Sequence, residues 1–170
     1  LNRILIKVFD KNIFLQKEIK KQTKNMRLSL QNNYSKKFDP ENIKYGRGGF
    51  QELELLVQMG MLLMNIGYRK NNQSPKKLIS CLFKVGFFDK EEYKNITEIY
   101  ELFFYYQQVS CIMFFETDQK KILSSHGVDY LIKNLSKSVY YNKEMNLNDL
   151  NLLLKQKSQY IGKLFDRKLE

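Results

Sequence analysis

The residues that could carry chemistry gather between Lys44 and Gln58, in a stretch that reads K-Y-G-R-G-G-F-Q-E-L-E-L-L-V-Q. Three glycines stand directly before a predicted helix that carries two carboxylates. Glycine allows tight turns and close backbone approach, and a helix N-terminus offers free N–H groups and a positive dipole end. Such a turn can hold a phosphate group, but it can also merely join two packed helices. The residues alone leave both interpretations open.

The polar side chains of this stretch fall on different sides of the helix. Glu54 and Gln58 are one turn apart and share a face, where they could border a cleft or simply face water or a neighbouring helix. Glu52 lies two residues from Glu54, about 200° around the helix, so the two cannot chelate one ion together. We expect Glu52 to be solvated or to lie beside the helix cap. Lys44 and Arg47 flank the glycines and could meet a phosphate or face solvent.

This stretch resembles the G-G-hydrophobic-x-D-I-E-F-x-x-Q signature of the glutamine synthetase adenylyltransferase family, enzymes that attach AMP to glutamine synthetase and remove it. The matching residues are Lys44, Gly48, Gly49, Glu54 and Gln58, while Glu52 replaces the usual Asp and Leu53 and Leu55 replace Ile and Phe. The likeness covers roughly residues 3–166 and is best to the carboxyl-terminal half of shorter, alphaproteobacterial-type members. Residues 103–108 depart from the family's L-R-x-x-E-H-x-L-Q run, so no Arg or His role on that helix is carried over.

The resemblance implies a helical domain that follows the C-terminal nucleotidyltransferase domain, which would lie upstream of Leu1. It implies a cytoplasmic enzyme that uses Mg²⁺ and ATP, with glutamine synthetase and the PII signal protein as partners beside the upstream domain. Residues next to the nucleotide or substrate would be Lys44, Gly48, Gly49, Glu52, Glu54 and Gln58.

The catalytic parts of such an enzyme are missing from this sequence. Nucleotidyl transfer needs paired carboxylates on a strand, usually after a Gly-Ser turn, to hold two metal ions. No glycine of the chain is followed by Ser, and no Asp-x-Asp occurs. We therefore expect no catalytic residue, no metal ligand and no cofactor bound to this chain alone.

The composition limits the classes of partner. The net charge is +11 from 29 basic and 18 acidic residues, but the basic residues are mostly Lys rather than the Arg that nucleic-acid recognition favours. The chain has no Ala and is rich in Asn, Ile, Phe and Tyr, which is typical of an AT-rich genome. Nucleic acid is thus an unlikely partner. Cys81 and Cys111 form no metal or disulfide motif, His126 lacks a partner in sequence, and no apolar run reaches membrane-spanning length.

Apolar residues recur at helical spacing nearly throughout, and no alternating strand pattern lasts beyond four residues. The sequence therefore predicts an all-α bundle of about six helices forming a single helical domain over 1–170. The predicted helices run from Leu15 toward Asp39, over 50–66, from Pro75 to Gly86, from an Asp89 cap toward Phe115, over 128–135, and from an Asn146 or Asn148 cap to Phe165. The first helix should face inward with Leu15, Ile19, Gln22, Met26, Leu30 and Tyr34. Met59, Met61, Met64 and the aromatic residues 103–106 are predicted core.

The predicted function is that of a supporting domain of a glutamine synthetase adenylyltransferase-like enzyme. A stand-alone helical interaction module without catalysis is the alternative, and a basic nucleic-acid-binding bundle is a third. A Gly-Ser turn followed by Asp-x-Asp upstream in the reading frame would separate the first two. Salt-dependent DNA binding would support the third.

Overall fold

The computed structural model of the chain describes residues 14–33, 43–66, 74–113, 129–130, 132–133 and 146–170. The helices are α2 (Phe14–Asn33), α3 (Phe50–Leu63), α4 (Pro75–Lys84), α5 (Lys90–Met113) and α7 (Leu147–Leu169). These five helices, with no strand in the ranges just given, confirm the all-α prediction. The predicted short helix over 128–135 lies mostly outside the described residues, although 129–130 and 132–133 are helical.

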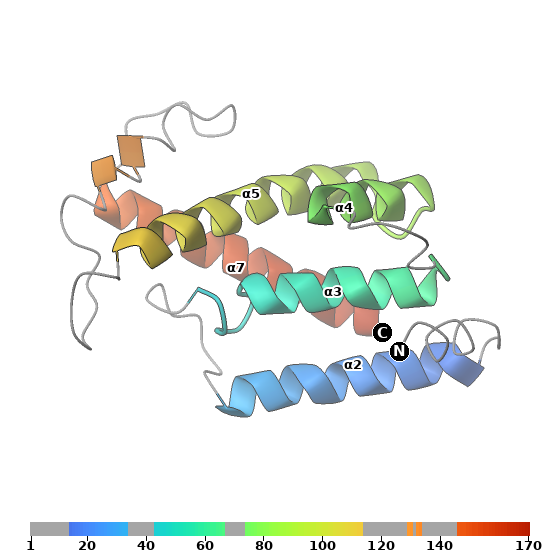
Figure 1. Cartoon of the computed structure of the whole chain (residues 1–170). Helices are drawn as coiled ribbons and strands as arrows, with labels where there is room; N and C mark the ends of the chain where they lie inside the picture. Colours follow the sequence, from blue (N-terminus) through green and yellow to red (C-terminus); the bar gives the residue numbers. More distant parts are fainter. Residues whose placement is uncertain (1–13, 34–42, 67–73, 114–128, 131, 134–145) are drawn as a thin grey trace.

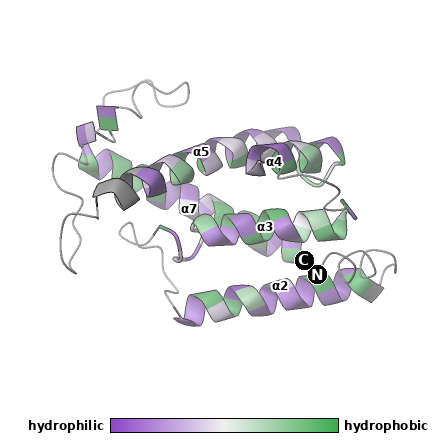
Figure 2. Cartoon of the chain, viewed as in Figure 1, coloured by the Kyte–Doolittle hydropathy of each residue, from purple (hydrophilic) through white to green (hydrophobic). Residues whose placement is uncertain are grey.

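Helix α3 lies at the centre of the bundle and contacts each of the other four helices. Figure 1 shows α3 between α2 on one side and the α4–α5 pair on the other, with α7 crossing behind it. Its sequence explains this place, because Leu53, Leu55 and Met61 are buried and lie on different sides of the helix. A helix that is apolar nearly all round belongs in a core. In Figure 2 purple, hydrophilic residues run along α2, whereas α3 is greener.

The helix ends follow local signals that the sequence carries. Asp89 and Glu92 form a capping box for α5: the Glu92 N–H donates to the Asp89 carboxylate at 2.7 Å, and the Asp89 N–H donates to the Glu92 carboxylate at 2.9 Å. Asn146 and Asp149 form the same motif for α7. Helix α4 begins at Pro75 and ends before Gly86, which has φ +79°.

Helix α3 ends earlier than predicted, at Leu63 rather than near Ile66. The residue that ends it is Asn65, which has φ +51°. The Asn65 N–H donates to the Leu62 carbonyl at 3.2 Å, and the Ile66 N–H donates to the Met61 carbonyl at 2.9 Å. This is the Schellman arrangement, with Asn in the left-handed position that Gly usually fills.

The predicted inward face of α2 is wrong by about one residue. Thr23 and Arg27 are its buried residues, whereas Met26 is 55% exposed and Gln22 faces solvent. One residue corresponds to about 100° of rotation around a helix. The rotation puts the Arg27 guanidinium against carboxylates of α3 and α7, a contact that hydrophobic periodicity cannot anticipate. Ile19 and Leu30 still pack against the core, and Tyr34 lies outside the described residues.

The remaining core predictions hold in most positions. Phe103 and Tyr106 are buried, as are Met59 and Met61, while Phe104 is 45% exposed and Met64 37% exposed. Met64 faces solvent because α3 has already ended at that position. Among the described residues no helix is both long enough and apolar enough to cross a lipid bilayer.

Candidate functional site

The glycine turn before α3 is closed by its own backbone. The N–H groups of Gly49, Phe50 and Gln51 donate to the carbonyls of Gly46, Ile43 and Lys44, at 2.8, 2.9 and 3.0 Å. A phosphate held at a helix N-terminus needs these first N–H groups free. Because the turn already uses them, this geometry favours the interpretation of the glycines as a packed connection over that of a phosphate cradle.

Gly48 is the residue for which the turn requires glycine. Its φ is +71°, in the left-handed region, and a Cβ there would lie 2.0 Å from the carbonyl oxygen of Ser158 on α7. The Ser158 hydroxyl also donates a 2.6 Å hydrogen bond to the Arg47 carbonyl. Gly49 has ordinary φ, but a Cβ there would meet the Ile43 carbonyl oxygen at 2.3 Å. The glycines therefore let the turn lie directly on the backbone of α7.

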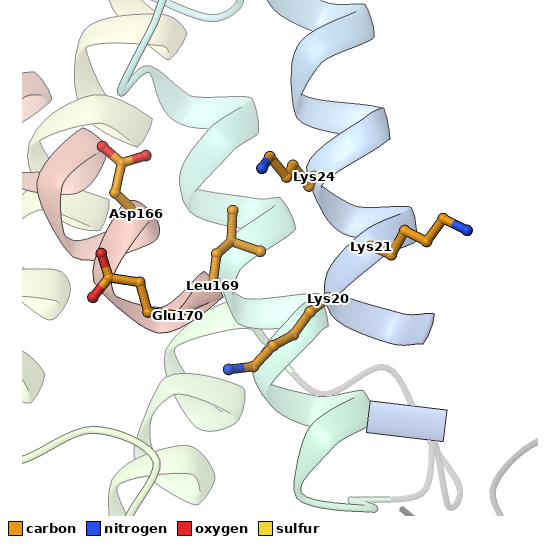
Figure 3. A pocket seen from close by; sticks show the side chains of 6 residues that line it. All are labelled: Lys20, Lys21, Lys24, Asp166, Leu169 and Glu170. Atoms are coloured by element: carbon orange, nitrogen blue, oxygen red, sulfur yellow. The ribbon is translucent and has the colours of Figure 1, made fainter. Parts of the chain in front are cut away.

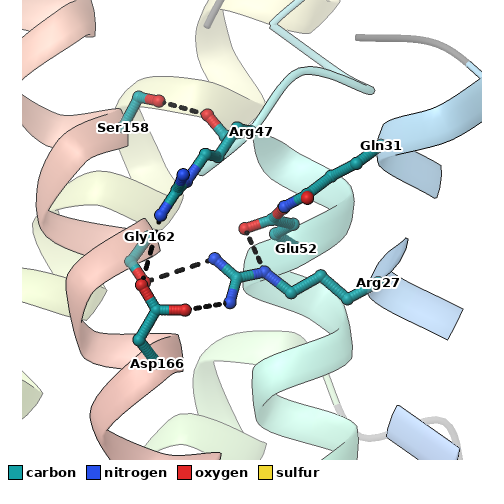
Figure 4. A network of polar contacts seen from close by, with 7 residues as sticks. All are labelled: Arg27, Gln31, Arg47, Glu52, Ser158, Gly162 and Asp166. Carbon is teal, nitrogen blue, oxygen red and sulfur yellow. Dashed lines mark hydrogen bonds and ion pairs between the residues drawn. The ribbon is translucent and has the colours of Figure 1, made fainter. Parts of the chain in front are cut away.

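Glu52 is buried, with 2% of its surface exposed, which corrects the prediction of a solvated or cap-side carboxylate. Its Oε2 lies 3.1 Å from Arg27 Nε on α2, an ion pair too bent to count as a hydrogen bond. Its Oε1 accepts a 2.7 Å hydrogen bond from Gln31 Nε2. Figure 4 shows Glu52 and Arg27 facing each other between α2 and α3. This partner could not be predicted from the sequence, because α2 and α3 meet only in the folded chain.

Arg27 joins three helices. Beyond Glu52, its Nη1 contacts the Asp166 carboxylate on α7, its Nη2 donates to the Gly162 carbonyl at 3.3 Å, and its guanidinium lies 4.4 Å from the centre of the Phe165 ring. Burial alone would lower the pKa of Arg27, but the close contacts with the negative carboxylates of Glu52 and Asp166 outweigh it, so the pKa is raised. Arg27 thus stays charged, and it fixes α2 relative to α3 and α7.

Glu54 and Gln58 lie on a different side of α3, the side that reaches solvent. Gln58 is exposed and Glu54 is half-buried, together with Gln51 one turn before it. Burial raises the pKa of Glu54, and the charge of Lys44 offsets this in part. Glu54 in turn contributes, after burial, to the raised pKa of Tyr100 on α5. The structure therefore brings Lys44, Glu54 and Tyr100 close together and separates Glu52 from them.

Lys44 is partly buried, and its ammonium lies 5.0 Å from the centre of the Tyr45 ring. Tyr100 packs beside Phe50, with ring centres 5.4 Å apart, and stacks on Phe104 with centres 6.0 Å apart. We call Lys44, Gln51, Glu54, Gln58 and Phe104 the open face, which lies next to the buried Tyr100. The sequence pointed to Lys44, Glu54 and Gln58, whereas the buried Tyr100 comes next to them through the packing of α5 on α3.

Within the described ranges, no group of three His, Cys, Asp or Glu side chains could hold a metal ion. Cys81 is a free, partly buried thiol. His126 and Cys111 fall where side chains are not described.

Comparison of the chain with known protein families, with curated proteins and with solved structures finds no match. The family resemblance consequently stays a prediction that depends on the residues of the Gly-Gly signature.

Proposed function

We propose that this chain is the helical domain of a glutamine synthetase adenylyltransferase-like enzyme, and that its open face packs against the nucleotidyltransferase domain. The chain itself performs no chemistry in this proposal. It supports the domain that binds ATP and Mg²⁺ and contributes to the surface offered to glutamine synthetase. The PII signal protein would be a further partner of the whole enzyme.

The observation that supports the proposal is the division of the signature into two halves. Gly48, Gly49 and Glu52 hold the turn, α2 and α7 together inside the bundle. Glu54 and Gln58 instead lie on the solvent side, where Glu54 is half-buried without a hydrogen bond or ion pair to another described residue. A half-buried carboxylate is costly unless something partners it. An adjoining domain that donates hydrogen bonds to Glu54 would remove that cost.

The experiment is a charge-neutralising substitution in the full-length enzyme. Glu54→Gln keeps the size of the side chain and should lower adenylyl transfer to glutamine synthetase while leaving the melting curve nearly unchanged. Glu91→Gln, on the exposed start of α5, is the matched control and should keep parental activity. Parental activity per folded molecule in Glu54→Gln would rule out this role for Glu54.

The isolated chain gives a second test. Incubated with labelled ATP, Mg²⁺ and glutamine synthetase, it should leave the synthetase unlabelled, because it lacks the carboxylate pair that the two-metal reaction needs. Measurable transfer of AMP would mean that the chain contains an active site of a different kind.

A stand-alone interaction module is the second candidate, and the aromatic part of the open face favours it. Phe104 is 45% exposed and stacks on Tyr100, and aromatic residues are enriched at protein interfaces. The reading frame upstream of Leu1 discriminates: a Gly-Ser turn followed by Asp-x-Asp supports the enzyme, and a frame without them supports the module.

A further inference from the structure

Helix α2 carries four lysines on one side. Lys17, Lys20, Lys21 and Lys24 follow the i, i+3, i+4, i+7 spacing that places residues within an arc of about 100° along roughly 10 Å of helix. Lys20 is partly buried and the other three are exposed. We call these four residues the lysine stripe. Such a stripe concentrates positive charge on one face of the molecule.

The lysine stripe is not neutralised inside the bundle. None of its four members forms an ion pair with another described residue, whereas Lys76, Lys157 and Lys168 each pair with a glutamate. The one acidic residue of α2, Glu18, accepts a hydrogen bond from Gln22 instead. Four unpaired ammonium groups so close together repel one another, and an anionic partner would relieve this repulsion.

The stripe borders a groove between α2 and the end of α7. The groove has a volume of about 340 Å³ and is lined by Lys20, Lys21, Lys24, Asp166, Leu169 and Glu170. Figure 3 shows Lys20 and Lys24 reaching from α2 toward α7, with the side chain of Leu169 between the two helices and Lys21 turned away. Asp166 is already paired with Arg27 and Arg47, so the lining keeps a net positive charge.

We propose that this groove is a docking surface for an acidic segment of a partner protein. Carboxylates of the segment would meet Lys20 and Lys24, and an aliphatic side chain would cover Leu169. A nucleic acid fits less well, because the lining offers neither Arg nor an aromatic ring. Charge complementarity of this kind mainly accelerates association and selects partners.

No segment of this chain outside the described ranges is acidic enough to occupy the groove. The segments outside the described ranges have at least as many Lys and Arg as Asp and Glu; they are residues 1–13, 34–42, 67–73, 114–128 and 134–145. We therefore assign the acidic segment to a protein outside this sequence. The docking proposal does not rest on the proposed function. The groove lies between α2 and α7, whereas Glu54 and Gln58 of the open face lie on the solvent side of α3.

The test is a binding titration of the whole chain by fluorescence anisotropy at low salt. The probes are a short labelled peptide of alternating Glu and Leu, and single-stranded DNA of the same net charge. Lys20→Gln with Lys24→Gln should weaken peptide binding by at least about fivefold, which corresponds to roughly 1 kcal/mol. Lys90→Gln with Lys94→Gln, an exposed pair with the same spacing on α5, should stay within about twofold of the parent.

Several outcomes would overturn the docking surface. One is that the parent chain does not bind the peptide. Another is that the two double variants lose the same amount of peptide affinity, which would mean that only the net charge of the chain matters. Tighter binding of the DNA probe than of the peptide, lost in the Lys20/Lys24 variant, would make the stripe a nucleic-acid contact. Melting curves of both variants check that the fold is retained.

Discussion

At the scale of single residues, the bundle depends on a buried charge. Arg27 and Glu52 are 5% and 2% exposed and form an ion pair with each other. Asp166 also contacts Arg27, and Gln31 donates a hydrogen bond to Glu52. Removing one partner of such a pair leaves an uncompensated buried charge, which typically costs about 3–5 kcal/mol. Arg27→Met should therefore lower the free energy of unfolding by about that amount, as measured by urea denaturation.

Arg47 is the control for this prediction. It pairs with the same Asp166, but half of its side chain is exposed, and exposed pairs contribute about 0–1 kcal/mol. Arg47→Met should accordingly cost less than about 1 kcal/mol. Equal losses for the two arginine variants would show that burial of the Arg27–Glu52 pair has no energetic weight.

Two glycines with similar backbone conformations allow the cost of backbone strain to be measured apart from the cost of steric overlap. Gly48 has φ +71° and no room for a Cβ, whereas Gly86 has φ +79° and open space around it. An alanine in the left-handed region costs about 1–2 kcal/mol from the backbone alone. Gly86→Ala should show only this loss, and Gly48→Ala should lose more because its Cβ would overlap the Ser158 carbonyl.

Thermal unfolding of the two alanine variants measures this difference. If Gly48→Ala and Gly86→Ala melt at the same temperature, the glycine turn does not lie as closely on α7 as described. The turn would then be an ordinary connection.

At the scale of helices, the ends of α5 and α7 use the same capping motif with different additional contacts. Glu92 caps α5 and also accepts contacts from Arg167 at 2.5 Å and Lys168 at 2.9 Å on α7. Asp149 caps α7 and is exposed. Loss of a capping contact typically costs about 1 kcal/mol of stability. Asp149→Ala should therefore lower the free energy of unfolding by about that amount.

Glu92→Ala should lower the free energy of unfolding by about 1–3 kcal/mol more than Asp149→Ala does, because it also leaves the partly buried Lys168 without its carboxylate partner. Chemical denaturation of both variants checks this order. Similar losses would mean that the contacts between the start of α5 and the end of α7 add nothing to the cap.

At the scale of the whole molecule, the raised pKa of Glu54 predicts that the stability of the fold depends on pH. Burial raises its folded pKa above the ordinary value of 4.5, so between these two pKa values the native state binds more protons than the unfolded state. The contribution of Glu54 to stability is therefore present below the unfolded pKa and is lost as pH rises through the folded pKa. Glu54→Gln cannot ionise and escapes this loss.

Melting temperatures of the isolated parent chain and of the same chain with Glu54→Gln, measured from acidic to neutral pH, test the sign of this effect. In the full-length enzyme the adjoining domain would partner Glu54, so the difference is expected in the isolated chain. The variant should equal the parent near pH 4 and melt higher near pH 7. A variant that melts lower at neutral pH would show that the Glu54 carboxylate has a stabilising partner within the isolated chain.

The sequence by itself determined the helices and most of their ends. Apolar spacing of 3.6 residues, the capping box that starts at Asp89, and Pro75 before a Leu-rich run are local signals, so they were readable without the fold. The cap of α7 was predicted at Asn146 or Asn148, and the structure has it at Asn146. The sequence also located the glycine turn, because a left-handed residue such as Gly48 leaves its mark in residue type. Asn65 carries the same kind of mark, but the apolar spacing around it predicted a helix that runs on to residue 66.

Only the tertiary structure decided which polar groups meet. Arg27 and Glu52 are remote in sequence, and Arg27 and Asp166 lie near opposite ends of the chain. Periodicity therefore predicted Met26 rather than Arg27 for the inward face of α2, and Glu52 was expected to be solvated or to lie beside the helix cap. The pairing rotates the buried face of α2 and removes Glu52 from the surface. It leaves Glu54 and Gln58 on the open face. A charge can enter a core only beside its counter-charge, and the position of the counter-charge is a property of the fold.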